Sequence, residues 1–295
     1  MKNTVFTGAG TAIITPLTKD GVDYKKFAEL IDWQIESGVD AIVAVGTTGE
    51  GSTLTDEEHK EAIKFCVDRV AGRIPVIAGT GSNDVEYAIQ LTQYACEAGA
   101  DAMLLVTPYY NKATQKGLIA SFTAIADAST KPCILYNVPS RTGCNLLPET
   151  VAVLAEHPNI VGIKEACGNI SQIAKLASLC GDKIDIYSGN DDQIVPILSL
   201  GGKGVISVLA NIMPAETALM CRKYFEGDTA GACRMQLDLL PLINALFCEV
   251  NPIPAKAACA AMGYCENYLR LPLTPMEADH EAVLLTLMRE QGLID

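Results

Sequence analysis

Eight short apolar runs recur along this 295-residue chain, and their starts lie 20 to 34 residues apart. Each interval leaves room for one helix, and the runs are nearly continuously apolar, as expected for a parallel sheet that is covered on its outer face. Eight such strand-and-helix units predict an α/β fold, a (β/α)8 TIM barrel, with an open doubly wound sheet as the main alternative. The strands are expected at residues 10–17, 41–46, 75–81, 102–108, 133–139, 160–166, 184–190 and 204–211.

Two intervening segments carry helix start and stop signals. Thr55 followed three residues later by Glu58 is a candidate capping box, and a helix beginning at Ser82 or Asn83 would end at Gly99. The sequence after residue 225 contains no convincing strand and reads as three helices. We therefore expect a catalytic barrel over residues 1–225 and a small C-terminal three-helix region over residues 226–295.

Composition excludes several classes of protein. The formal net charge is −13, which is a poor match for nucleic acid or for an anionic membrane surface. No stretch reaches the ~20 apolar residues that span a bilayer, and the N-terminal sequence is not of the signal-peptide type. The eleven cysteines are scattered without a CxxC pair, which favours a reduced, cytoplasmic setting over a disulfide framework.

Polar residues follow several predicted strands, and in a barrel of this kind the chemistry lies at the carboxyl ends of the strands. Thr47 and Thr48 stand in a Gly-rich turn whose amides and hydroxyls could hold a small carboxylate, although an ordinary tight turn would look the same. Tyr136 is either a core tyrosine or an acid/base group. Arg141 is either a surface residue or a clamp for a second carboxylate.

Lys164 is the residue with the most specific chemical implication. It stands in the apolar run "IVGIKEA", where alternation places it on the same face as Gly162 and opposite Glu165. An ordinary lysine would carry its charge to water at the strand end. If Lys164 instead faces the barrel mouth, with Gly162 leaving space for its stem, burial lowers its pKa. The neutral amine could then form an imine with a ketone.

Other chemistries fit less well. The three histidines, His59, His157 and His280, are far apart in sequence and show no metal-ligand spacing, so no metal site is expected. The segment "GGKGVIS" at 201–207 could be a phosphate cradle or simply a tight turn before the last strand.

Six motifs together resemble the pyruvate-dependent Schiff-base class I aldolase/lyase superfamily, and within it the 4-hydroxy-tetrahydrodipicolinate (dihydrodipicolinate) synthases. They occur in order along nearly the whole chain, and Thr48 and Arg141 in particular match the synthases rather than the sialic-acid lyases. The motifs are "GTTGE" (46–50), "TPYYN" (107–111), "YNVPSRTG" (136–143), "GIKEA" (162–166), "GVISVLAN" (204–211) and "NPIPAK" (251–256).

The resemblance implies a role for each site residue. Lys164 would form the imine with pyruvate, and Tyr136 would move protons, linked through Thr47 to Tyr110, which in the family reaches into a neighbouring subunit. The other implied roles concern substrate binding: Thr48 with Thr47 for the pyruvate carboxylate, Arg141 for the carboxylate of L-aspartate 4-semialdehyde, and Gly189 and Ile206 for the pocket around the lysine.

The implied reaction is the first committed step of diaminopimelate and lysine biosynthesis, with no metal or bound cofactor, in a homotetramer built from dimers. Two alternatives stay open: another aldolase of the superfamily, acting on a keto-sugar acid or hydroxy-oxoglutarate, and a binding protein that has lost catalysis.

Inhibition by lysine also stays open. Family members that lysine inhibits commonly carry an Asn and, four residues later, a Glu, whereas here Asn83 is followed by Tyr87 at that position and Glu86 is one residue short. Candidate residues of a regulatory lysine site are Ser52, His59, Asn83, Glu86 and Tyr109.

Overall fold

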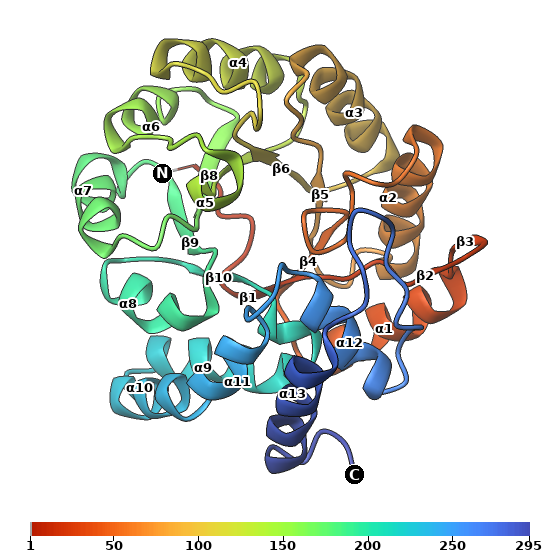
Figure 1. The fold of residues 1–295 in the computed structure, drawn as a ribbon. Coiled ribbons are helices and arrows are strands. Elements are labelled where there is room, and N and C mark those ends of the chain that lie inside the picture. The colour runs from red at the N-terminus through yellow and green to blue at the C-terminus, as the bar shows by residue number, and fades with distance from the viewer. Residues whose placement is uncertain (1) are drawn as a thin grey trace.

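A closed barrel of eight parallel strands forms the centre of the molecule, and helices surround it (Figure 1). The computed structural model describes residues 2–295. Each barrel strand pairs with its neighbours in chain order, and the first strand closes the barrel by pairing with the last. The barrel strands are β1 (Gly8–Ala12), β4 (Ala41–Ala44), β5 (Val76–Gly79), β6 (Ala102–Val106), β7 (Cys133–Asn137), β8 (Ile160–Glu165), β9 (Asp185–Ser188) and β10 (Gly204–Ser207).

One longer helix follows each barrel strand and covers the outer face of the sheet, so the predicted (β/α)8 TIM barrel is confirmed. These helices are α1 (Tyr24–Glu36), α2 (Asp56–Val70), α3 (Val85–Ala98), α4 (Gln115–Ala128), α6 (Pro148–Leu154), α7 (Ile170–Cys180), α8 (Ile194–Ser199) and α9 (Pro214–Phe225). The short helix α5 (Pro139–Thr142) lies in the loop directly after β7.

Alternation along the strands separates two apolar layers. On β7, Leu135 packs into the large cluster between strands and helices, whereas its neighbour Ile134 belongs to the smaller cluster inside the barrel. Tyr136 and Tyr187 also lie in the inner cluster, one on each strand that flanks β8. The barrel interior is therefore a filled core, and polar groups within it need a specific reason to be there.

Local sequence signals explain the ends of two helices. Thr55 and Glu58 form the predicted capping box at the start of α2. Helix α3 ends at Gly99 in the left-handed conformation, as predicted. Its N-cap, however, is Asp84 rather than Ser82 or Asn83, because the Asp84 carboxylate accepts hydrogen bonds from the first amides of the helix.

Several predicted boundaries were wrong. The first strand ends at Ala12 instead of residue 17, and an antiparallel pair that was not predicted, β2 (Leu17–Thr18) and β3 (Gly21–Val22), precedes α1. The last strand ends at Ser207, and residues 209–211 form a 3-10 turn. The segment 201–207 enters β10 at the rim opposite the strand ends, so it is the tight turn and not a phosphate cradle at the mouth.

Four helices rather than three follow residue 225: α10 (Thr229–Asp238), α11 (Leu240–Ala245), α12 (Ile253–Ala261) and α13 (Ala278–Glu290). The predicted first helix is divided between Asp238 and Leu240, because Pro241 lacks an amide hydrogen and fits only the first turn of a helix. These helices pack beside α1 and α9 (Figure 1). The division of the chain at residue 225 stays a prediction.

Candidate active site

Three side chains lie in one row across neighbouring strands near the barrel mouth. Lys164 on β8 is in register with Tyr136 on β7 and with Tyr187 on β9. Lys164 is only 5% exposed, and its Nζ lies 4.5 Å from the centre of the Tyr136 ring. The lysine therefore faces the barrel interior and is not an ordinary surface residue whose charge reaches water.

Burial changes the protonation of Lys164. Desolvation, assisted by the positive charge of Arg141, lowers its pKa from 10.5 to about 8, and the buried carboxylate of Asp191 opposes this shift. A substantial fraction of the amine is consequently neutral near physiological pH, which is the form that attacks carbonyl carbon. Glu165 points the other way, toward the Asn137 amide and the Cys167 backbone, as alternation predicted.

The glycine that makes room for the lysine is not the one that we expected. A side chain at Gly162 would meet the Tyr187 ring at 3.3 Å, so that space is already occupied by the tyrosine. A Cβ at Gly189 would instead lie 3.1 Å from Cε of Lys164 and 2.7 Å from Ala166. Gly189 therefore provides the space for the lysine stem. Which glycine does so depends on the neighbouring strand, and alternation within β8 alone could not reveal it.

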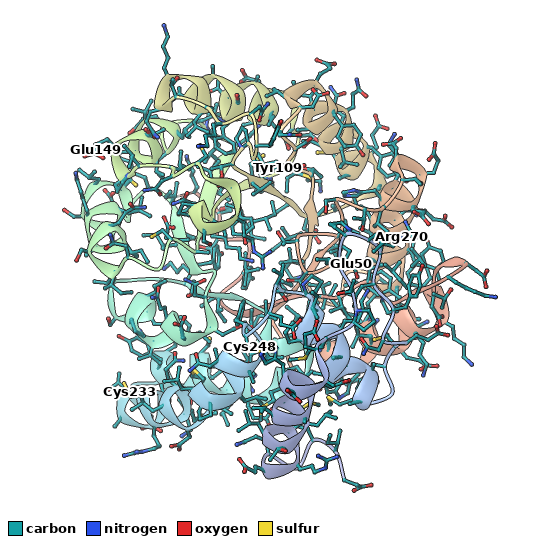
Figure 2. All side chains as sticks on the ribbon, in the orientation of Figure 1. Glu50, Tyr109, Glu149, Cys233, Cys248 and Arg270 are labelled. Carbon is teal, nitrogen blue, oxygen red and sulfur yellow. The ribbon has the colours of Figure 1, made fainter. Side chains whose placement is uncertain are left out.

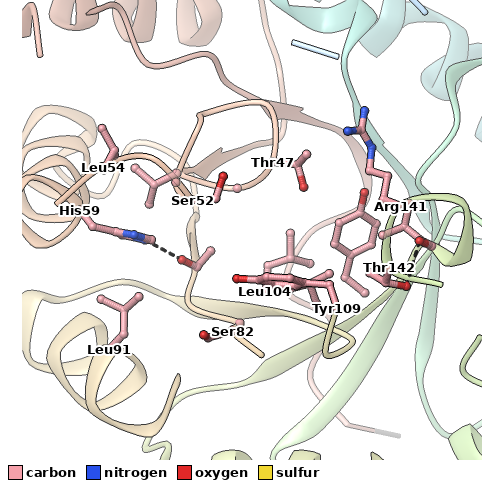
Figure 3. Close-up of a pocket in the computed structure, with 18 of the residues that line it drawn as sticks. Thr47, Ser52, Leu54, His59, Ser82, Leu91, Leu104, Tyr109, Arg141 and Thr142 are labelled. Carbon is pink, nitrogen blue, oxygen red and sulfur yellow. Dashed lines mark hydrogen bonds between the residues drawn. The ribbon is translucent and has the colours of Figure 1, made fainter. Parts of the chain in front are cut away.

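Tyr136 is buried beside the cavity that opens at the barrel mouth. Burial raises the pKa of its phenol, while the nearby Arg141 charge and the Thr47 hydroxyl oppose that rise. Thr47 and Arg141 both line this cavity and lie at the end away from His59 and Leu91 (Figure 3). The phenol thus stays protonated at neutral pH and can act as a proton donor.

The turn after β4 is held in an unusual backbone conformation. Val45 and Glu50 have φ values of 49° and 53°, and a β-branched residue rarely adopts the left-handed region. Glycines surround this bend, since a Cβ at Gly51 or Gly79 would lie 2.3 or 2.8 Å from the Val45 carbonyl oxygen. The turn that carries Thr47 and Thr48 is therefore strained and must be held from outside.

A buried ion pair holds the turn. The Glu50 carboxylate accepts hydrogen bonds from Nζ of Lys256 on α12 and from the backbone amide of Arg270. Both side chains of the pair are essentially unexposed. The Arg270 guanidinium also bonds the Glu58 carboxylate and the Thr53 carbonyl. Figure 2 shows Glu50 and Arg270 close together beside α2.

Asn251 is a second contact from the C-terminal region that we did not predict. Its side-chain amide donates a 2.9 Å hydrogen bond to the Thr48 hydroxyl, and its carbonyl accepts one of 3.1 Å from Arg141. Asn251 and Lys256 both belong to the "NPIPAK" motif, which the sequence marked as similar to the family without giving its residues a role.

Asp191 is also absent from the predicted site. It follows β9, is fully buried, and accepts hydrogen bonds from the Ser207 hydroxyl and from the amides of Val208 and Leu209. No sequence pattern distinguishes it from its neighbour Asp192.

Tyr110 lies apart from the other site residues within this single chain. It is 92% exposed and adopts a φ of 69°, with no partner shown among residues 2–295 for its hydroxyl. Ile206, by contrast, is fully buried in the inner cluster with Tyr136 and Tyr187.

A cavity of about 370 Å³ extends from the Tyr136 and Arg141 end of the mouth toward helices α2 and α3 (Figure 3). Three of the predicted regulatory residues line it: Ser52, His59 and Tyr109. Burial lowers the pKa of His59, whose Nε2 lies 2.9 Å from the Gly79 carbonyl oxygen. This residue is therefore neutral at physiological pH.

The other two predicted regulatory residues do not line the cavity. Asn83 donates a hydrogen bond to the Tyr109 carbonyl, and Glu86 is exposed beside Gln90 on the outer side of α3. Tyr87, which stands four residues after Asn83 where lysine-inhibited relatives commonly carry Glu, lines the cavity, whereas Glu86 does not. None of the residues that line the cavity is acidic.

Comparison with known proteins identifies the family. The model of the dihydrodipicolinate synthetase family matches residues 5–291. The chain belongs to the dihydrodipicolinate synthetase family. It is 58% identical over 292 residues to the 4-hydroxy-tetrahydrodipicolinate synthase of Lachnoclostridium phytofermentans, which covers 98% of this chain and 99% of that protein.

Solved structures of the family have the same fold. A dihydrodipicolinate synthase from Acinetobacter baumannii, complexed with pyruvate, is 46% identical with a TM-score of 0.96 over 99% of this chain and 100% of that one. The enzyme from Cyanidioschyzon merolae, with lysine bound, is 42% identical with a TM-score of 0.95 over the same shares.

Membership of the dihydrodipicolinate synthetase family confirms that the chain is an enzyme, a lyase, and favours the synthase over the aldolases and over a non-catalytic protein. Within residues 2–295, no helix is long and apolar enough to cross a membrane. The same part of the chain contains no group of three or more His, Cys, Asp or Glu placed to hold a metal ion.

Proposed function

We propose that the chain condenses pyruvate with L-aspartate 4-semialdehyde to give 4-hydroxy-tetrahydrodipicolinate, the first committed step of diaminopimelate and lysine biosynthesis. The observation that carries the proposal is the buried amine of Lys164, with a pKa of about 8, at the carboxyl end of β8. Family membership and the synthase relatives give the substrates.

The chemistry begins with attack of the neutral Lys164 amine on the ketone carbon of pyruvate. Loss of water leaves a C=N bond, and the iminium withdraws electrons so that a methyl proton departs and an enamine forms. The enamine carbon attacks the aldehyde carbon of the semialdehyde. The amino group of that substrate then attacks the C=N carbon and displaces Lys164, which closes the ring and frees the enzyme.

We assign proton transfer during these steps to Tyr136, whose raised pKa keeps it a donor and whose ring lies against the lysine. Thr47 and Thr48 would bind the pyruvate carboxylate, and Arg141 the carboxylate of the semialdehyde. Gly189 would line the pocket at the lysine stem, and Ile206 would line it from β10.

Borohydride trapping tests the first step. Reduction in the presence of pyruvate should fix a stable adduct, and peptide mass mapping should place it on Lys164. Lys164→Arg should remain folded and give no adduct, because arginine stays protonated in proteins. An adduct on another lysine, or none, would contradict the mechanism. Turnover of a keto-sugar acid but not of aspartate semialdehyde would favour the alternative aldolase.

We further propose a cytoplasmic homotetramer built from dimers, in which Tyr110 reaches the site of the neighbouring subunit. Its high exposure and left-handed backbone support a role outside its own chain. Mixed dimers of Tyr110→Phe and Lys164→Met subunits provide the test. One site in each hybrid would contain both an intact lysine and an intact partner tyrosine, so mixing should restore activity that neither variant has alone.

We propose that lysine binds in the part of the cavity lined by Ser52, His59 and Tyr109. Asn83 would support Tyr109 through its hydrogen bond to the Tyr109 carbonyl, and Glu86 would lie outside the site. Because the wall lacks a carboxylate to pair with an ammonium group, we expect weak inhibition. Tyr87→Glu should lower the half-inhibitory lysine concentration by about tenfold or more, whereas Tyr87→Phe should not. An unchanged value for Tyr87→Glu would contradict this placement.

A further inference from the structure

The hydrogen bond between Asn251 and Thr48 has a fixed direction. An amide N–H can only donate, so the Thr48 oxygen must accept, and the hydroxyl hydrogen must point to another acceptor. The described residues 2–295 provide no such acceptor, although Thr48 is 3% exposed and Asn251 is 5% exposed. The hydroxyl is thus left as a donor without a protein partner.

The reverse orientation of the amide is less favourable. Oδ1 of Asn251 is buried without a hydrogen-bond partner. Turning the amide around would satisfy that oxygen through the Thr48 hydroxyl, but it would remove the partner of the amide nitrogen. A buried donor group with two hydrogens would then be left unpaired, and burying an unpaired donor is costly.

The segment that carries Asn251 is held at several points. The Asn251 carbonyl accepts a hydrogen bond from Arg141, and Lys256, five residues later on α12, pairs with Glu50 in the same turn as Thr48. Asn251 therefore has little freedom to move away from the threonine. It links Thr48, on the loop after β4, to Arg141, on the loop after β7.

We propose that Asn251 is a positioning residue that keeps the Thr48 hydroxyl pointed as a hydrogen-bond donor toward the carboxylate of the keto acid. The inference rests on the proposed function, which places a pyruvate carboxylate at Thr48. A carboxylate only accepts hydrogen bonds, so a threonine fixed as a donor binds it, whereas a threonine fixed as an acceptor repels it.

Asn251→Asp replaces the amide that donates to Thr48 with a carboxylate that can only accept, and it changes the shape of the side chain little. The new carboxylate can only accept, so the Thr48 hydroxyl turns toward it and away from the substrate. The pyruvate concentration that half-saturates borohydride trapping should rise by about 10- to 100-fold. KM for the semialdehyde should change by less than about threefold, because the Arg141 contact uses the backbone carbonyl. Asn251→Ala should give a smaller rise in the same direction.

Two comparisons separate this role from general damage to the fold. Asn267→Asp makes the same chemical change at another asparagine of the C-terminal region. Its Oδ1 is likewise buried without a partner, but it has no hydrogen bond to Thr48. This variant should leave the pyruvate concentration that half-saturates trapping unchanged. Thr48→Val removes the hydroxyl, so adding Asn251→Asp to it should raise half-saturation by less than about twofold. Thermal unfolding of every variant reports any loss of stability separately.

The inference is overturned if Asn251→Asp affects both substrates equally, or if its effect persists in full in the Thr48→Val background. Should Asn251→Asp not fold, Asn251→Ala decides, and unchanged half-saturation in that variant overturns the inference. Absence of any trapped pyruvate on the wild-type chain would overturn the proposed function and this inference together. Normal trapping with unshifted Asn251 variants would overturn only the inference.

Discussion

Nζ of Lys164 lies 4.5 Å from the centre of the Tyr136 ring because the two residues are direct register partners on β7 and β8. The barrel thereby places the proposed nucleophile against the proposed proton donor without the use of a flexible loop. Both groups are buried, and burial favours the neutral form of each. Neutral amine and neutral phenol are the forms in which attack on a ketone and donation of a proton begin.

Lys164→Met should stabilise the protein at pH 7. The fall of the Lys164 pKa from 10.5 to about 8 means that holding the charged amine costs the folded state about 3 kcal/mol at neutral pH. Between pH 8 and 10.5 the unfolded chain still binds a proton that the folded chain has released, so wild-type stability rises with pH. The methionine variant should therefore unfold at higher denaturant concentration at pH 7, and this gain should vanish toward pH 10.5.

Lys175→Met is the matched control for that measurement. Lys175 pairs with Glu149 on the surface and is 56% exposed, so its replacement should give no pH-dependent gain in stability. Equal behaviour of the two variants would contradict the burial penalty that we assign to Lys164.

Tyr136→Phe should lower kcat by about 100- to 10,000-fold, the usual contribution of a positioned acid or base. Borohydride trapping at long incubation should still detect the pyruvate adduct, since Lys164 is intact. Tyr187→Phe serves as the control. Tyr187 flanks the lysine on the other side, but its hydroxyl donates a 2.7 Å hydrogen bond to the Phe6 carbonyl oxygen. Removing that hydroxyl should therefore lower the unfolding temperature and leave kcat nearly unchanged. A large fall in kcat for Tyr187→Phe, with little change for Tyr136→Phe, would instead assign proton transfer to Tyr187.

The sequence predicted the barrel because the spacing of its apolar runs is a local property, and the barrel in turn placed the polar residues that follow its strands at one rim. Alternation within "IVGIKEA" placed Lys164 and Glu165 on opposite faces, but it left open which of the two faces the barrel interior. The contacts of Asn251 and Lys256 could not be predicted in this way. The bonds from Asn251 to Thr48 and from Lys256 to Glu50 each join residues more than 200 positions apart, and no local pattern identifies either partner.

Errors arose where a neighbouring element decides the outcome. The space beside Gly162 is filled by a tyrosine from β9, which no pattern within β8 reveals. The division between α10 and α11 had a local signal, Pro241, that the apolar periodicity around it concealed. Tyr110 remains exposed in one chain, and its proposed role depends on a partner subunit.

Arg141→Ala should raise KM for the semialdehyde by about 10- to 100-fold, the value of a lost charge-assisted hydrogen bond. KM for pyruvate should change by less than about threefold. The same change removes a positive charge that lowers the Lys164 pKa, so the acidic limb of the pH profile for pyruvate trapping should move to higher pH. Arg73→Ala, which removes an arginine that binds Asp32 on the outer surface, should change neither KM for the semialdehyde nor the pH profile of trapping.

Glu50→Gln should destabilise the protein by about 3–5 kcal/mol, because it leaves the buried ammonium of Lys256 without a counter-charge. The same variant should raise the pyruvate concentration needed for trapping, since the strained turn of Thr47 and Thr48 loses its anchor. Glu149→Gln, which breaks the exposed pair with Lys175, should cost less than about 1 kcal/mol. Denaturant unfolding at a fixed protein concentration measures both. The double variant Glu50→Gln with Lys256→Met should recover stability but not pyruvate affinity if the ion pair acts mainly by holding the turn of Thr47 and Thr48. Recovery of both would mean that apolar packing alone can hold the turn, which would contradict this role of the ion pair.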